Sequence, residues 1–100
     1  IGLGALPVMA EALDMYRKGV TTGANRANRQ LAWEHIRFEK PAPEWQQEIV
    51  MDPQTSGGLL AAVRADQAEA VLAELHRRGV KGARLIGWVK PRADAYLVFD

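Results

Sequence analysis

The apolar positions before residue 21 follow the repeat of an α-helix. Apolar side chains recur alternately three and four residues apart, so they share one face of a helix. The members of this set are Leu6, Met9, Leu13, Tyr16 and Val20. This spacing predicts a helix over residues 6–20, with Gly19 just past its C-terminal end.

The next segments carry weaker patterns. Residues 21–30 have no apolar period and are rich in Thr, Gly and Asn, which predicts a polar loop. Residues 31–40 are too short and mixed to assign. Pro43 suits the first turn of a short helix, in which Trp45 and Ile49 lie one turn apart.

A strand followed by a helix is predicted after residue 58. The run Leu59–Val63 has strand length and is apolar throughout, which favours a strand buried on both faces. Asp66 with Glu69 three residues later forms a capping box, and Gly79 ends the helix. Its expected buried stripe consists of Ala68, Val71, Leu72 and Leu75. Its expected surface pairs join Glu74 to Arg77 and Arg78.

The C-terminal segment resembles a β-hairpin. Apolar residues gather at 85–89 and at 96–99, and the connection 91–94 has turn chemistry. The predicted order from residue 58 is therefore β-α-β-β, in an α/β (α+β layered) domain with helices packed on a mixed sheet.

Composition limits the class of protein. With 100 residues, 48% hydrophobic and 25% charged, the chain matches a single soluble globular domain and is too apolar to be disordered. Its longest apolar runs have five residues, far short of a membrane span. No cysteine is present, which excludes disulfides and thiolate sites and makes the cytoplasm the expected compartment. The opening residues do not form a signal peptide, and we expect a segment cut from a longer chain.

Charge is balanced overall but uneven along the chain. The net charge of +1 predicts no nucleic-acid binding. Residues 17–40 hold six basic side chains against two acidic ones, whereas residues 41–75 hold six acidic side chains and Arg64 alone. The basic stretch either faces an anion or forms a solvated surface.

Candidate chemistry is confined to two polar loops. His35 and His76 are the only imidazoles, and no metal-ligand spacing or nucleophile motif accompanies them. Residues 23–28 and 52–58 each combine glycine with hydroxyl or amide side chains. Such loops bind phosphate through backbone N–H groups and hydroxyls, but the same composition also forms ordinary tight turns.

The string at Asp52–Leu60, Asp-Pro-Gln-Thr-Ser-Gly-Gly-Leu-Leu, resembles the signature of the selenophosphate synthetases (selenide, water dikinases). Residues 23–28, Gly-Ala-Asn-Arg-Ala-Asn, and residues 85–89, Leu-Ile-Gly-Trp-Val, are similar to that family in the same order. One departure is Ala27, where the family often has Arg, and the arginine of this chain, Arg26, stands one position earlier.

The resemblance implies a fold and a reaction. It implies that residues 1–100 are most of the C-terminal domain of an aminoimidazole ribonucleotide synthetase-like enzyme. The whole enzyme would be a homodimer that converts ATP, selenide and water to selenophosphate, AMP and phosphate. The catalytic Cys or selenocysteine, its Lys and the magnesium-binding aspartates would lie in an N-terminal domain outside this chain. The chain alone is then expected to be inactive and to bind neither ATP nor magnesium by itself.

The resemblance also marks the candidate site. It implies that Thr55, Ser56, Gly57, Gly58 and Asn28 bound the nucleotide or phosphate side. Asp52 and Gly23 would hold the loops in shape, although Asp52 is equally suited to ligand contact. The alternatives are a related ATP-dependent kinase of the superfamily, such as a thiamine-phosphate kinase or a hydrogenase-maturation protein, and a non-catalytic dimerisation or interaction module.

Overall fold

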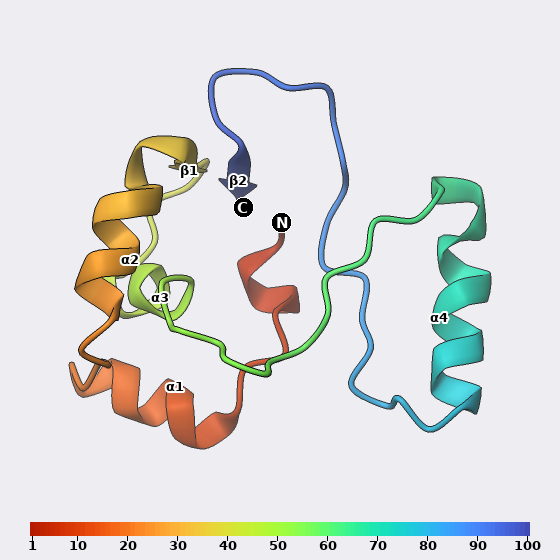
Figure 1. Cartoon of the computed structure of the whole chain (residues 1–100), viewed down its shortest axis with the longest axis horizontal. Helices are drawn as coiled ribbons and strands as arrows, with labels where there is room; N and C mark the ends of the chain where they lie inside the picture. Colours follow the sequence, from red (N-terminus) through yellow and green to blue (C-terminus); the bar gives the residue numbers. More distant parts are fainter.

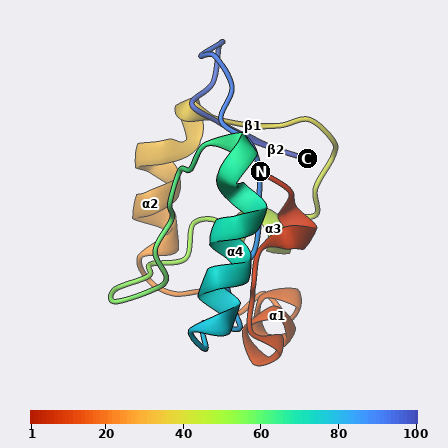
Figure 2. The ribbon, with the colours of Figure 1, turned by 90° about the vertical axis from the view of Figure 1, so that its right-hand side faces the viewer.

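The computed structural model describes residues 1–100 as a main body with one outlying helix (Figure 1). The main body holds α1 (Ala10–Arg17), α2 (Asn25–Ala32), α3 (Glu44–Ile49), β1 (Ile36–Phe38) and β2 (Leu97–Phe99). Helix α4 (Ala68–Arg77) stands apart from it, and Figure 2 shows this helix nearest to the viewer with the main body behind. Short 3₁₀ turns occupy Leu3–Ala5, Trp33–His35 and Ala65–Gln67. The radius of gyration is 14.7 Å, against about 13 Å for a compact chain of this length, so the arrangement is open.

The sheet consists of two parallel strands. β1 and β2 pair in the register Ile36 with Leu97 and Phe38 with Phe99. The rings of Phe38 and Phe99 stack with their centroids 5.3 Å apart. The other edge of β2 is occupied by the first residues of the chain, because the Ile1 ammonium donates to the Val98 carbonyl at 2.7 Å. Both edges of the last strand are therefore paired.

This pairing shows that the predicted C-terminal hairpin is wrong. Residues 85–89 form no strand, and the strand at residues 97–99 pairs with β1 instead. Since β1 lies on one edge of β2 and residues 1–3 lie on the other, β2 offers no free edge to residues 85–89. Arg37 also pairs with Asp94 at 2.5 Å, which draws the segment before β2 toward β1.

The strand predicted at Leu59–Val63 is absent as well. These residues have no regular structure, and the exposed fractions of Leu59 and Leu60 are 101% and 75%. A five-residue apolar run becomes a strand only where a neighbour pairs with it, and nothing pairs here. The α/β class is confirmed by helices with a parallel sheet, while the β-α-β-β order is wrong.

The helix predictions had mixed outcomes. α1 confirms the helical period but begins at Ala10, after Pro7. The short helix after Pro43 is confirmed as α3. The predicted polar loop at residues 21–30 is wrong from Asn25 onward, where α2 begins. Its asparagines bond to other elements, so tertiary contacts outweigh their preference for turns.

Helix α4 forms where the sequence predicts it, but its first turn differs. A 3₁₀ turn at Ala65–Gln67 delays the start of α4 to Ala68, and Asp66 pairs with Arg64 instead of capping the helix. Its apolar stripe is only partly covered, since Ala68 alone is buried. The predicted pairs of Glu74 with Arg77 and Arg78 are confirmed at 2.6 Å each.

None of the helices has the length and apolar character that a membrane span requires.

Gly79 ends α4 with a φ of +89°, and its N–H donates to the His76 carbonyl. We expect Gly79→Ala to lower the local stability of α4 by about 1 kcal/mol, because a Cβ there is strained even in open space. Hydrogen exchange of the α4 amides measures this. Gly82→Ala is the matched control, since Gly82 also faces open space without a positive φ. Equal exchange in the two variants would contradict the prediction.

Candidate functional site

The most enclosed polar side chain of the chain is Asn25, at the start of α2. Asn25 is only 2% exposed, and every polar atom of its side-chain amide has a hydrogen-bond partner. Its Nδ2 donates to the Glu48 carbonyl at 2.8 Å and to the Tyr16 hydroxyl at 3.2 Å. Its Oδ1 accepts from the Thr22 hydroxyl at 2.6 Å. Asn25 therefore joins α1, α2 and α3 at one point.

Asn28 repeats this role one turn later on α2. Its Nδ2 donates to the Met51 carbonyl at 2.8 Å, and Met51 is 2% exposed. Residues three apart share a helix face, and the two carbonyls that Asn25 and Asn28 bind are also three residues apart. The Glu48 carbonyl also accepts from the Met51 N–H at 3.0 Å, and Met51 lies in the turn just after α3, so the two amides bind the C-terminal turn of α3 from outside.

An ion pair fixes the same two helices beside the asparagines. Arg29 Nη2 lies 2.7 Å from Glu48 Oε1, and both side chains are mostly covered. The Arg29 guanidinium also lies 4.3 Å from the centroid of the Trp33 ring. Arg29 is thus committed to structure and is not presented to a ligand.

The hydroxyl of Tyr16 connects this cluster to the signature string. It donates to Asp52 Oδ1 at 2.5 Å. Burial, and then the hydrogen bond to Asp52, raise the pKa of Tyr16 to about 12. The phenol therefore stays protonated and keeps donating throughout the physiological pH range. Asp52 is held as a structural acceptor here.

The loop beyond Asp52 is exposed and held by local bonds. The Gln54 amide donates back to the other carboxylate oxygen of Asp52, and the Gly57 N–H donates to the Gln54 carbonyl at 3.2 Å. Ser56 has a φ of +57°, in the left-handed region. A Cβ on Gly57 would lie 3.0 Å from the Cβ of Gln54, so glycine suits this close turn.

The structure brings most of the predicted site residues together. Asn28 holds the residue that precedes Asp52, and Thr55, Ser56, Gly57 and Gly58 follow as an exposed turn. The side chains of Thr55 and Ser56 make no hydrogen bond within the chain. Gly23 lies in the turn before α2 with open space at its Cβ position and no positive φ, so no geometric requirement for glycine is seen there.

Two residues of the cluster, Tyr16 and Glu48, are not predicted from sequence as part of a site. The sequence marks Asn25 only as one member of the string at residues 23–28. The three-residue spacing of Asn25 and Asn28 is the one signal that points to them, and it has meaning only if residues 25–32 are helical. Because the sequence pattern predicts a loop at residues 21–30, this spacing does not stand out before the helix is known.

The site carries no nucleophile or metal centre of its own. No group of three or more His, Asp or Glu side chains is placed to hold a metal ion. The carboxylates nearest the loop, Asp52 and Glu48, already accept hydrogen bonds from Tyr16 and Arg29. The residues of this chain therefore do not fit a magnesium site.

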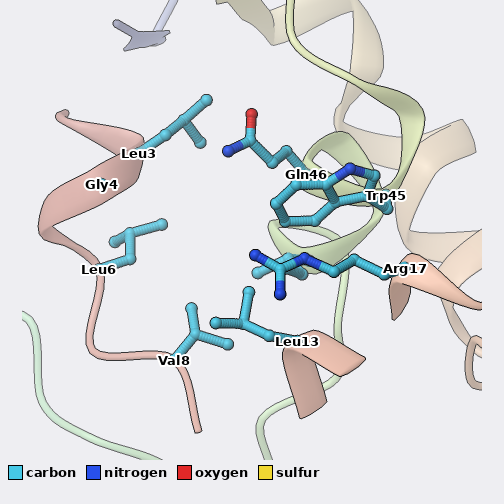
Figure 3. Close-up of a pocket in the computed structure, with 9 residues that line it drawn as sticks. Leu3, Gly4, Leu6, Val8, Leu13, Arg17, Trp45 and Gln46 are labelled. Carbon is cyan, nitrogen blue, oxygen red and sulfur yellow. The ribbon is translucent and has the colours of Figure 1, made fainter. Parts of the chain in front are cut away.

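A separate apolar hollow of about 210 Å³ lies between the first residues, α1 and α3 (Figure 3). The Arg17 guanidinium lies 5.0 Å from the centroid of the Trp45 ring at this hollow. The remaining lining is mostly aliphatic, from Leu3, Leu6, Val8, Leu13 and Ile49. No residue of the loop at 52–58 lines it, so the hollow and the loop are distinct features.

The raised pKa of Tyr16 predicts a loss of stability at high pH. An unfolded phenol ionises near pH 10, whereas folded Tyr16 ionises near 12. The stabilisation is fully present below pH 10 and is lost as pH rises toward 12. In urea unfolding across this range, the wild type should lose stability more steeply than Tyr16→Phe. Parallel curves would contradict this prediction.

Relatives with known names match nearly all of this chain. It is 39% identical over 88 residues to a "Selenide, water dikinase" of Agathobacter rectalis, covering 88% of this chain and 26% of the relative. It is 39% identical over 92 residues to the protein of that name from Porphyromonas gingivalis, covering 91% and 26%. With the Bdellovibrio bacteriovorus protein it shares 36% identity over 100 residues, covering 100% and 28%.

The chain thus spans about a quarter of the length of these relatives. No solved structure matches it significantly. A family model, "AIR synthase related protein, C-terminal domain", matches residues 3–100. The match includes α2, α3, the loop at 52–58, α4 and both strands, so the chain belongs to the AIR synthase related protein C-terminal domain family.

Proposed function

We propose that this chain is the C-terminal domain of a selenide, water dikinase, whose full protein makes selenophosphate, AMP and phosphate from ATP, selenide and water. One observation carries the proposal. Proteins of that name are 36–39% identical to this chain over 88–100% of its length. The signature string and the asparagine string lie within the region that the family model matches, and Asn28 donates to the carbonyl of Met51, the residue just before the signature string.

The same proposal assigns the catalytic centre to another part of the protein. Phosphoryl transfer needs metal ions and a positioned nucleophile, and the residues of this chain fit neither requirement. An N-terminal domain that supplies both, homodimer formation, the use of ATP with magnesium and a cytoplasmic location all belong to the proposal, because the family resemblance implies them. Residues 1–100 then act as a partner domain to that centre.

We assign the loop at 52–58 to the nucleotide or phosphate side of the reaction. Two hydroxyls, on Thr55 and Ser56, are exposed and free of hydrogen bonds within the chain. Free hydroxyls and nearby backbone N–H groups are suitable donors to phosphate oxygens. Asp52 and Asn28 are already occupied by structural hydrogen bonds, so we assign them to holding the loop.

A second candidate function is an interaction module without a ligand of its own. Large apolar side chains remain uncovered beside the loop and along the segment after α4. The most exposed of them are Leu59, Leu60, Trp88 and Val89. Exposed apolar surface of this kind is typical of sites that contact another protein surface.

Replacement of both loop hydroxyls separates the two candidates. In the full-length protein, we expect Thr55→Ala/Ser56→Ala to raise the KM for ATP by about tenfold or more, because each hydrogen bond to a charged phosphate contributes roughly 1.5–3 kcal/mol. Selenide-dependent AMP formation is the assay. Thr21→Ala is the matched control, since Thr21 is also exposed and bonds to nothing through its hydroxyl.

The outcomes distinguish the proposals. A raised KM in the double variant with an unchanged Thr21→Ala control supports nucleotide contact. Wild-type kinetics in both variants would make the loop structural and favour the interaction module. No selenide-dependent AMP formation by the wild-type protein would overturn the assignment of the reaction.

A further inference from the structure

The loop at 52–58 is attached to the main body only at its beginning. Two consecutive residues are held there: the Met51 carbonyl by Asn28 and the Asp52 carboxylate by Tyr16. Beyond Asp52, the only hydrogen bonds of residues 53–58 are local, from the Gln54 side chain and the Gly57 N–H. The direction in which the loop leaves the body is therefore set at Asp52.

We propose that Tyr16, oriented by Asn25, is a positioning residue that fixes Asp52 and so sets where the hydroxyls of Thr55 and Ser56 lie. This inference rests on the proposed function of the loop. The Tyr16 hydroxyl bonds to Asn25 and Asp52 and makes no hydrogen bond to residues 53–58, so it acts through the Asp52 carboxylate.

The geometry of the hydroxyl supports a directed bond. Asn25 Nδ2 donates to the Tyr16 oxygen at 3.2 Å, which leaves the single phenol hydrogen for an acceptor. Two acceptors are near: Asp52 Oδ1 at 2.5 Å and Asn25 Oδ1 at 3.3 Å. The shorter contact goes to a carboxylate, and hydrogen bonds to ionised acceptors are the stronger ones. The Asn25 amide thus donates to the Tyr16 phenol, and the phenol donates to the Asp52 carboxylate at the start of the loop.

Burial and further hydrogen bonds hold both Asn25 and Tyr16 in place. Tyr16 and Asn25 are buried, and Asn25 is further bonded to Thr22 and to the Glu48 carbonyl. The Arg29–Glu48 ion pair adjoins the cluster, because the Glu48 carboxylate that pairs with Arg29 also accepts from the Asn25 amide at 3.1 Å. Asp52 is less enclosed than its two neighbours in the chain of bonds, so it is the member whose position depends on the others.

The test uses the full-length protein with Tyr16→Phe, which removes the hydroxyl and keeps the ring. Tyr96→Phe is the matched control, because Tyr96 is 60% exposed, its hydroxyl makes no hydrogen bond within the chain, and its ring packs against His35 and Arg92. Two quantities are measured on folded samples: hydrogen exchange of the two hydrogen-bonded amides, at residue 52 (which donates to the Ile49 carbonyl) and at Gly57, and kcat/KM for ATP in selenide-dependent AMP formation.

We expect Tyr16→Phe to speed exchange of the amides at residue 52 and Gly57 roughly tenfold and to lower kcat/KM for ATP by a similar factor, while Tyr96→Phe changes neither. A double-mutant cycle separates positioning from general stability. In an Asp52→Ala background, Tyr16→Phe should have no further effect on either quantity, because the hydrogen bond from the Tyr16 hydroxyl to the Asp52 carboxylate is already absent.

Unchanged exchange in Tyr16→Phe would overturn the inference, and so would a full additive effect of Tyr16→Phe in the Asp52→Ala background. If the wild-type protein forms no AMP with selenide, the proposed function fails, and the exchange measurement alone decides the positioning role. Faster exchange with unchanged kcat/KM would support the positioning of the loop and contradict its part in nucleotide binding.

Discussion

Burial of one uncharged amide governs the arrangement of the main body. A buried polar group that loses its hydrogen bonds costs about 1–3 kcal/mol, so Asn25 requires partners for both its donor and its acceptor atoms. Those partners come from three separate elements: Tyr16 on α1, Thr22 before α2 and the Glu48 carbonyl on α3. Meeting this requirement fixes the helices relative to one another. Apolar packing alone is too sparse to do so, since only four apolar residues are buried.

The same cluster gives a physical reason for two sequence strings to occur together. Asn28 holds the carbonyl that precedes the signature string, and Tyr16 holds the string's first carboxylate. Both strings therefore contribute to one local structure, although 23 residues separate Asn28 from Met51. The hydroxyls of Thr55 and Ser56, by contrast, are exposed and make no hydrogen bond within the chain.

Outside the main body, burial is low and local bonds dominate. Helix α4 is stabilised by its own pairs, from Glu74 to Arg77 and Arg78, and by the turn at Gly79. Exposed pairs of this kind contribute little, typically below about 1 kcal/mol. The apolar residues on both sides of α4, such as Leu60 and Trp88, are uncovered. Uncovered apolar side chains of this kind are typical of surfaces that contact another protein surface.

Sequence pattern is sufficient to predict the family resemblance, the helical period of α1, the short helix after Pro43, and α4 with its end at Gly79. Each depends on residues close together in the chain, where propensity and spacing decide. Tertiary structure decided that Asn25 begins a helix, that the last strand pairs with β1, and that Tyr16 reaches Asp52. These features join residues far apart in sequence. Local pattern carries no signal for which donor meets which acceptor, because that choice follows from burial and from the edges that other segments already occupy.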